Sequence, residues 1–435
     1  MLSVIKSSWP LLLGMLLLML GNGLQGSLLG VRGSTLGFSA FQMSIVMSAY
    51  FAGFLFASRV TPAMIRRVGH VRVFAALGSL VSAALLLFPT IQDPIVWVLG
   101  RMIIGFCFCG VYVTAESWLN NSSTNENRGQ ALSAYMMVQM TGIIIAQGLL
   151  VVPDPSGYLL FVIPSVLVSI SFAPILLSIS PTPAFESTKP MSLRELFTVS
   201  PLGFVGMFMM GSVFAAQFGM AAVYATEAGL SITQVPFFTA AFYVGALLFQ
   251  YPIGWISDRT DRRVLIALSA AIAGAGSIGG MLFGGNFYVL LASAFLIGGL
   301  SNPLYSLLIA YTNDFLEYED MASASAGLLF VNGVGAITGP LLIGYAIQVV
   351  GPPGFFLFLA FILLMMAGYA VYRMTQRPSP SVEDTSAYQS MMPTVSPVTV
   401  EIASEWAIET AEAEAEAEAQ AAEEADQSEQ RSYGT

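Results

Sequence analysis

One apolar stretch, residues 95–118, carries both an acid and a base, which makes it the first place to look for chemistry. Glu116 is the only carboxylate well inside an apolar run of the body of the chain, and Arg101 precedes it by about four helical turns. A carboxylate withdrawn from water is harder to ionise, so such a group can take up and release protons near neutral pH. Glu116 is therefore a candidate proton carrier. Arg101 is a candidate for tuning that proton affinity or for holding an anionic group.

Arg101, Tyr112 and Glu116 share one face of a helix, together with Phe108. A guanidinium that faces lipid is costly, so we expect this face to point toward the protein interior. Two alternatives stay open. Arg101 could reach back to the outer head groups, and Glu116 could stay ionised in a pair with a nearby arginine.

Amide, phenol and charged side chains interrupt other apolar runs, where hydrogen bonding is the chemistry they offer. An amide in lipid needs a partner, which is either a bound solute or a neighbouring helix, and the sequence leaves both interpretations open. The candidates for a substrate or proton pathway are Asn22, Gln25, Arg32, Arg101, Tyr112, Glu116, Gln217, Asn302 and Tyr305.

The residue types that build metal centres and active sites are scarce. The chain has one His, His70, and two Cys, Cys107 and Cys109, both within an apolar run. We find no nucleophile and base at a catalytic spacing and no phosphate-binding loop. The sequence predicts no metal, no cofactor, no enzymatic activity and no nucleic-acid partner.

Hydropathy predicts the elements that position these residues. The 435-residue chain is 56% hydrophobic and 10% charged, with a mean hydropathy of +0.74, whereas a soluble domain carries about 25% charged residues. Runs of about 20 apolar residues cross a bilayer as helices, because backbone groups in lipid must be satisfied within the segment. We expect an all-α integral membrane protein with twelve transmembrane helices, at residues 9–31, 41–61, 73–90, 95–118, 129–151, 158–178, 199–223, 235–256, 264–283, 288–312, 322–347 and 355–373.

Positive charge distinguishes the two membrane faces. With twelve spans, the lysines and arginines of the loops and ends, from Lys6 to Arg377, fall on one side, and the other side offers only Arg32. The positive-inside rule makes the richer side cytoplasmic, which places both termini in the cytoplasm.

The chain also repeats itself at a distance of 193 residues. Gly105, Tyr112, Asn120, Glu126 and Gly142 recur as Gly298, Tyr305, Asn313, Glu319 and Gly335. Internal repeats with a shared site at their interface are typical of secondary transporters. This pattern predicts two pseudo-symmetric six-helix halves, residues 1–180 and 199–373, joined by a cytoplasmic linker at residues 181–198.

Residues 374–435 differ in composition from the body. They carry 2 Lys and Arg against 13 Asp and Glu, while residues 1–373 carry 14 against 13. High charge with few apolar residues predicts a disordered acidic cytoplasmic tail, either solvated or docked to a basic partner.

A charged turn at residues 254–263, between two apolar runs, carries a family resemblance. Its sequence, Gly-Trp-Ile-Ser-Asp-Arg-Thr-Asp-Arg-Arg, resembles the loop signature of the major facilitator superfamily, Gly-x-x-x-Asp-Arg-x-Gly-Arg-Arg, with Asp261 in place of the second glycine. The resemblance implies a transporter whose first, fourth, seventh and tenth helices line a central cavity. It also implies that Asp258 caps a helix and that Arg262 pairs with an acid, for which Asp314 is the candidate.

The same resemblance implies a cytoplasmic latch, which we expect to hold the cytoplasmic side shut in the outward-open state. The first-half copy of the turn departs from the signature: with Gly69 aligned, Arg66 stands at the aspartate position, so the acid is either lost or supplied by Glu116. The expected latch residues are Arg66, Arg67, Gly69, Arg128, Gly254, Asp258, Arg259, Arg262, Arg263 and Asp314.

Two further patterns refine the resemblance. Gly335-x-x-x-Gly339-Pro340 resembles a helix-bending motif that the family carries at its fifth span, although a simple proline kink explains it equally well. Residues 115–119 with 127–129, and residues 303–305 with 313–314 and 325–328, resemble a poorly characterised bacterial branch of the family. We therefore expect a multi-pass, monomeric protein of the bacterial inner (cytoplasmic) membrane.

Together these features predict a secondary active transporter that moves a small-molecule substrate by alternating access, with proton coupling through Glu116 as the finer hypothesis. The first alternative is a multidrug efflux pump. The second is a non-transporting membrane receptor or scaffold that signals through the acidic tail.

Overall fold

The computed structural model describes residues 2–123, 127–152, 154, 157–176, 191–377, 388 and 391. Every regular element in these ranges is helical. Within them, eleven helices are long and apolar enough to cross a membrane, and a shorter apolar helix takes the place of the sixth predicted span. The all-α membrane fold expected from hydropathy is confirmed.

The helices divide between two halves of the chain. The first half contains α1 (Leu2–Thr35), α2 (Ala40–Val68), α3 (His70–Thr90), α4 (Pro94–Ser122), α5 (Arg128–Leu149) and α6 (Leu159–Leu176). The second contains α7 (Leu193–Val199), α8 (Pro201–Ala215), η1 (Ala216–Met220), α9 (Ala221–Glu227), α10 (Gln234–Ser257), α11 (Arg262–Phe283), α12 (Phe287–Asn313), α13 (Tyr318–Val350) and α14 (Gly354–Met374).

Several helices extend beyond the predicted apolar runs because polar caps continue them past the hydrocarbon. Ser39 and Gln42 form a reciprocal capping box at the start of α2. Asp93 accepts hydrogen bonds from two backbone N–H groups at the start of α4. Gly69 separates α2 from α3 with a φ of 86°, a conformation that favours glycine.

The seventh predicted span differs from the expectation of one regular helix. It consists of α8, a π-helical turn η1, and α9. A π-helical turn inside an α-helix is rare and frequently marks a functional site. Hydropathy predicts a single span over Pro201–Glu227 and does not reveal the turn.

Parts of the linker and tail predictions lie outside the described residues. These are residues 181–190 of the linker, Glu126 of the repeat, and all tail residues after Arg377 except Tyr388 and Met391. The described end of the linker forms the short helix α7. Met391 is buried, with 5% of its surface exposed, so at this residue the structure differs from a solvated tail.

Glycines allow close helix packing at equivalent places in the two halves. A side-chain carbon at Gly105 of α4 would collide with the carbonyl oxygen of Tyr50 on α2. One at Gly298 of α12 would collide with the carbonyl oxygen of Phe242 on α10. Because these glycines are 193 residues apart, the sequence repeat corresponds to a repeated packing contact.

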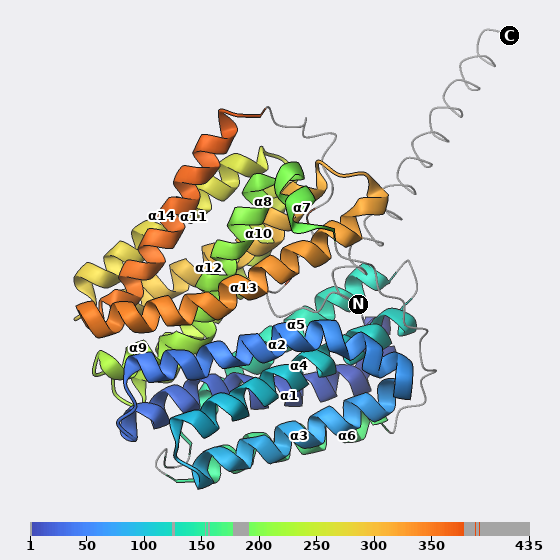
Figure 1. Ribbon diagram of the computed structural model, residues 1–435, viewed down its shortest axis with the longest axis vertical. Helices are drawn as coiled ribbons and strands as arrows, with labels where there is room; N and C mark the ends of the chain where they lie inside the picture. The colour runs from blue at the N-terminus through green and yellow to red at the C-terminus, as the bar shows by residue number, and fades with distance from the viewer. Residues whose placement is uncertain are drawn as a thin grey trace, which may run out of the picture.

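The two halves approach each other near α9 and diverge toward the other end of the bundle (Figure 1). Near α9, Gly30 of α1 lies so close to Ala222 that a side-chain carbon on the glycine would be 2.9 Å from the Ala222 methyl. Ser48 of α2 donates a hydrogen bond of 2.7 Å to the carbonyl of Ile337 on α13. We call this end the closed end. The other end, where α2, α4, α10, α12 and α14 terminate, is called the basic end.

Candidate functional site

Arg101 faces the interior of the first half and is completely buried. One of its terminal nitrogens donates to the Gln25 side-chain oxygen of α1, and the other lies 3.6 Å from the Met47 sulfur. The guanidinium carbon lies 4.6 Å from the centre of the Tyr50 ring. These partners on α1 and α2 are all neutral, so the positive charge of Arg101 has no carboxylate partner in the described part of the chain. The inward orientation excludes the alternative that it reaches for head groups.

A second polar group lies on the same face of α4. The Asn22 amide donates to the hydroxyl of Tyr112 at 2.9 Å and to that of Tyr50 at 3.4 Å. The Tyr112 hydroxyl in turn lies 3.5 Å from the Met19 sulfur. Asn22, Gln25, Arg101 and Tyr112, which the sequence predicted as pathway residues, are therefore brought together by α1 and α4.

Glu116 lies six residues before Ser122, where α4 ends. It is therefore farther from the end of its helix than a span ending at residue 118 would place it. At 1.5 Å per residue, these six residues span about 9 Å. Its side chain is 1% exposed and accepts a hydrogen bond of 3.1 Å from the Tyr135 hydroxyl on α5. Tyr135 was not predicted from the sequence, where its only signal was a polar tip on an apolar helix.

The second half contributes a smaller polar cluster at the π-helical turn. The Gln217 side chain, within η1, donates to Ser301 at 2.7 Å and accepts from Asn302 at 2.9 Å. Both partners are on α12. Tyr305 is also buried on α12, and its hydroxyl has no hydrogen-bond partner among the described residues. Gln217 and Asn302 were predicted, whereas the π-helical geometry that presents Gln217 was not.

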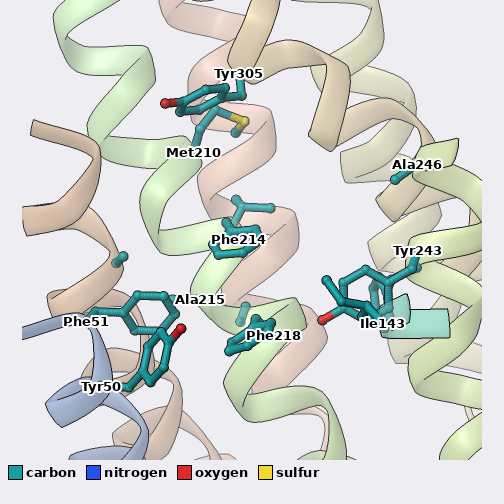
Figure 2. Packing of buried hydrophobic residues seen from close by; sticks show 14 of the residues in the cluster. Tyr50, Phe51, Ile143, Met210, Phe214, Ala215, Phe218, Tyr243, Ala246 and Tyr305 are labelled. Atoms are coloured by element: carbon teal, nitrogen blue, oxygen red, sulfur yellow. The ribbon is translucent and has the colours of Figure 1, made fainter. Parts of the chain in front are cut away.

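Aromatic rings occupy the space between the two halves (Figure 2). The Tyr50 ring centre lies 5.7 Å from that of Phe218, and the Phe51 ring centre lies 6.2 Å from that of Phe214. Tyr50 and Phe51 come from α2, Phe214 from α8 and Phe218 from η1. We call these four residues the aromatic layer. Arg101 and Tyr112 both lie next to Tyr50, Arg101 against its ring and Tyr112 through the shared Asn22 amide. Sequence reasoning missed the aromatic layer because aromatic residues in an apolar span look like ordinary core.

A hydrogen bond joins the two halves on the closed-end side of the aromatic layer. The Thr239 hydroxyl of α10 donates to the Gln147 side-chain oxygen of α5 at 2.8 Å. The same oxygen accepts from Ser27 of α1 at 2.6 Å, and the Gln147 amide donates to the Gly23 carbonyl at 3.0 Å. Neither Gln147 nor Thr239 was predicted as a site residue.

The charged turn at the basic end forms the predicted ion pair. Arg262 of α11 bonds to Asp314 at the end of α12, and their side chains are 2% and 3% exposed. Arg262 also bonds to Ser257 at 3.2 Å and lies 3.7 Å from the carboxylate of Asp258, which is 40% exposed. All of these residues belong to the second half. The contacts of Arg262 with Ser257 and Asp314 therefore hold α10, α11 and α12 together within that half.

The other expected latch residues are spread more widely. Arg259 stacks on the exposed Trp255 ring at 4.3 Å and is not brought to the ion pair. Arg263 bonds to Asp261 and to the carbonyl of Arg377, at 2.6 Å, which ties α11 to the chain after α14. Arg66 and Arg67 are exposed at the end of α2, whereas Arg128 at the start of α5 and Arg32 near the end of α1 are half-buried.

The predicted helix-bending motif acts in helix packing. α13 continues through Pro340 without a break. A side-chain carbon at Gly335 would collide with the carbonyl of Phe208 on α8, and one at Gly339 would lie 2.7 Å from the Ser212 Cα. Gly142, the repeat equivalent of Gly335, makes a similar close contact between α5 and Met19 of α1. The motif therefore allows α13 to approach α8.

Among the described residues, no group of three or more His, Cys, Asp or Glu side chains could hold a metal ion. Away from the ion pair at the basic end, the buried polar residues offer hydrogen bonding together with the charge of Arg101 and the carboxylate of Glu116. This arrangement can bind a solute or a proton.

Comparison with known proteins is consistent with this arrangement. The Major Facilitator Superfamily pattern matches residues 11–238 and again residues 202–408. The uncharacterized MFS-type transporter YcaD of Salmonella arizonae is 26% identical over 369 residues, covering 82% of this chain and 94% of that protein. The homologue of the same name from Salmonella typhi is 24% identical, with 85% and 96% covered.

Two solved structures share the fold at 14% sequence identity. A variant of the nucleoside transporter NupG superposes with a TM-score of 0.72, covering 84% of this chain and 99% of that one. A bacterial homologue of the human lysosomal transporter Spinster, in an inward-facing and occupied conformation, superposes with a TM-score of 0.70, covering 87% and 97%. The chain is a multi-pass membrane transporter, and it belongs to the major facilitator superfamily.

Proposed function

We propose that the protein is a secondary active transporter that moves a small organic anion by alternating access, with its binding site beside the aromatic layer. The burial of Arg101 among neutral groups is the observation that supports an anionic substrate. A buried guanidinium surrounded only by neutral groups is costly, and a carboxylate or similar anionic group on a solute would offset that cost. The rings of Tyr50 and Phe218 offer an apolar surface for the rest of the solute.

Alternating access is supported by the way the halves meet. The Gln147–Thr239 hydrogen bond joins them on one side of the aromatic layer, while they diverge toward the basic end (Figure 1). Rocking of one half against the other would break the contacts at the closed end and form new ones at the basic end. The basic end is cytoplasmic by the positive-inside rule, in the inner membrane of a bacterium.

Proton coupling is proposed to run through Glu116. The carboxylate is buried within α4, and the Tyr135 hydroxyl bonded to it can hold or relay a proton. The alternative, in which Glu116 only helps to close the basic end, predicts a different response to neutralisation.

The substrate class is tested by ligand-induced thermal stabilisation of the purified protein. A ligand that binds the folded state raises its melting temperature. The screen uses small monocarboxylic acids with an aromatic or branched apolar part, each paired with its uncharged amide. We expect the acids, and not the amides, to stabilise the protein. Arg101→Gln should abolish this difference, while Arg101→Lys, which retains the charge, should keep part of it. Equal stabilisation by acid and amide would refute the anion assignment.

Membrane orientation is tested separately. Single cysteines replacing the exposed residues Arg66 and Arg259 should react with a membrane-impermeant reagent from the same, cytoplasmic, side. Labelling of the two positions from opposite sides would overturn the twelve-span arrangement and the positions assigned to all site residues.

A further inference from the structure

Tyr388 of the acidic tail lies against the basic end of α10. Its hydroxyl accepts a hydrogen bond of 3.0 Å from Gln250, and its backbone N–H donates one of 2.8 Å to Asp258. Its ring covers Gly254 so closely that a side-chain carbon on that glycine would lie 2.6 Å from the ring. The Tyr388 hydroxyl is protonated at neutral pH, and burial raises its pKa further above the ordinary value.

Met391 lies against α12 in a similarly specific way. Its N–H donates to the Ser306 hydroxyl oxygen at 2.8 Å, and that hydroxyl donates back to the Met391 carbonyl at 3.1 Å. Only 5% of the Met391 surface is exposed. A buried apolar side chain and two reciprocal backbone bonds are more than an accidental surface contact would supply.

The position of this contact on α10 shows what it obstructs. At 100° per residue, Gln250 and Gly254 lie within about 60° of Thr239 on the helix surface. Thr239 is the residue through which α10 bonds to Gln147 of α5 at the closed end. Tyr388 therefore occupies the continuation, at the basic end, of the α10 face that contacts the first half.

We propose that Tyr388 and Met391 form an intramolecular brake, which binds the basic ends of α10 and α12 and keeps the two halves from closing there. This inference rests on the proposed alternating-access function. Closure at the basic end would bring the first half onto the α10 face that Tyr388 covers, so the brake must leave first. Because it binds only one of the two conformations, it shifts the population toward the form that is joined at the closed end.

The brake is tested by two measurements that need no solute. Hydrogen–deuterium exchange of the full-length protein reports the docking itself, since the Tyr388 and Met391 amides are hydrogen-bonded only when docked. Maleimide labelling of a Ser44→Cys variant reports opening of the closed end, because Ser44 is fully buried there against α13. The labelling is compared with and without a second substitution in the tail.

We expect Tyr388→Ala to remove protection at Met391 and to speed labelling of Ser44→Cys about tenfold, which corresponds to about 1.4 kcal/mol. Tyr388→Phe keeps the ring over Gly254 and should have a smaller effect. Met391→Leu keeps the volume and both backbone bonds and is the matched control, with both readouts near those of the parent.

Two results would overturn the brake. One is fast exchange at both amides in the parent protein. The other is loss of protection in Tyr388→Ala without faster labelling of Ser44→Cys, because the segment would then dock without affecting the conformations. If the proposed substrate class is wrong, only the thermal-stabilisation screen will show it. Amide exchange and Ser44→Cys labelling use no solute, so both still test the brake.

Discussion

Gly105 of α4 and Gly298 of α12 make the same contact in the two halves of the chain, each against a backbone carbonyl of the neighbouring helix. An added methyl group at either position would push two spans apart, and overpacking of this kind typically costs about 1 to 3 kcal/mol. We expect Gly105→Ala and Gly298→Ala each to lower the melting temperature of the purified protein. Gly148→Ala on α5 is the control, because nothing lies within 4 Å of the added carbon. Equal melting of all three variants would contradict the packing role.

The Arg262–Asp314 ion pair should be important for stability because both side chains are almost fully buried. Asp314→Asn leaves the arginine charge without its closest partner, and breaking a buried pair typically costs about 3 to 5 kcal/mol. Asp258 offers little replacement, since it is 40% exposed and 3.7 Å away.

The check is a double-mutant cycle of chemical or thermal unfolding with Arg262→Gln, Asp314→Asn and the combined variant. We expect the combined variant to be more stable than the sum of the single losses predicts. Additive losses would mean that the two side chains are not energetically coupled.

The hydrogen bond between Thr239 and Gln147 should bias the conformation of the transporter. Thr239→Val has a similar shape and lacks the hydroxyl, so it removes one net hydrogen bond, worth about 1 kcal/mol. The closed end should then open more often, and Ser44→Cys should be labelled about fivefold faster. Thr226→Val is the matched control. The Thr226 hydroxyl donates to the carbonyls of Ala222 and Val223, which belong to the same helix, α9. Similar acceleration in the control would argue against the assigned role of Thr239.

Neutralising Glu116 separates its two proposed roles. If the carboxylate carries protons, Glu116→Gln should abolish accumulation driven by a pH gradient in proteoliposomes while exchange of solute across the membrane continues. Tyr135→Phe removes the hydrogen bond to the carboxylate and should change the pH dependence of transport without abolishing it. Unchanged gradient-driven transport in Glu116→Gln would eliminate the carrier role and leave Glu116 as part of the closing machinery.

Much of this arrangement was predictable because it depends on local pattern. Apolar runs predicted the helices, and the repeat of Gly105 at Gly298 predicted two halves before any contact was known. The partner of Arg262 could be predicted as Asp314 because a family resemblance supplied the pairing rule. The inward orientation of Arg101 followed from the cost of a guanidinium in lipid.

The remaining features depend on contacts between distant segments. Tyr135 near Glu116, the aromatic layer, and the Gln147–Thr239 bond are each made of residue types that are common in membrane helices. Tyr388 was missed for a different reason. Its acidic surroundings in the tail predicted solvation, and composition averages cannot reveal that one tyrosine fits over Gly254. Arg259 was predicted as a latch residue from its position in the motif, but its guanidinium stacks on the Trp255 ring and does not join the ion pair.

The π-helical turn at Ala216–Met220 has a consequence for how the seventh span could have arisen. A π-helical turn holds one residue more than the α-helical turn it replaces, so the extra residue bulges locally and the helix beyond it keeps its direction. Deleting one residue from the turn would therefore restore a continuous α-helix in which Ala222 still meets Gly30. The deletion would instead remove the placement of Gln217 against Ser301 and Asn302. The extra residue is therefore a feature of the polar cluster and not of the packing between the halves.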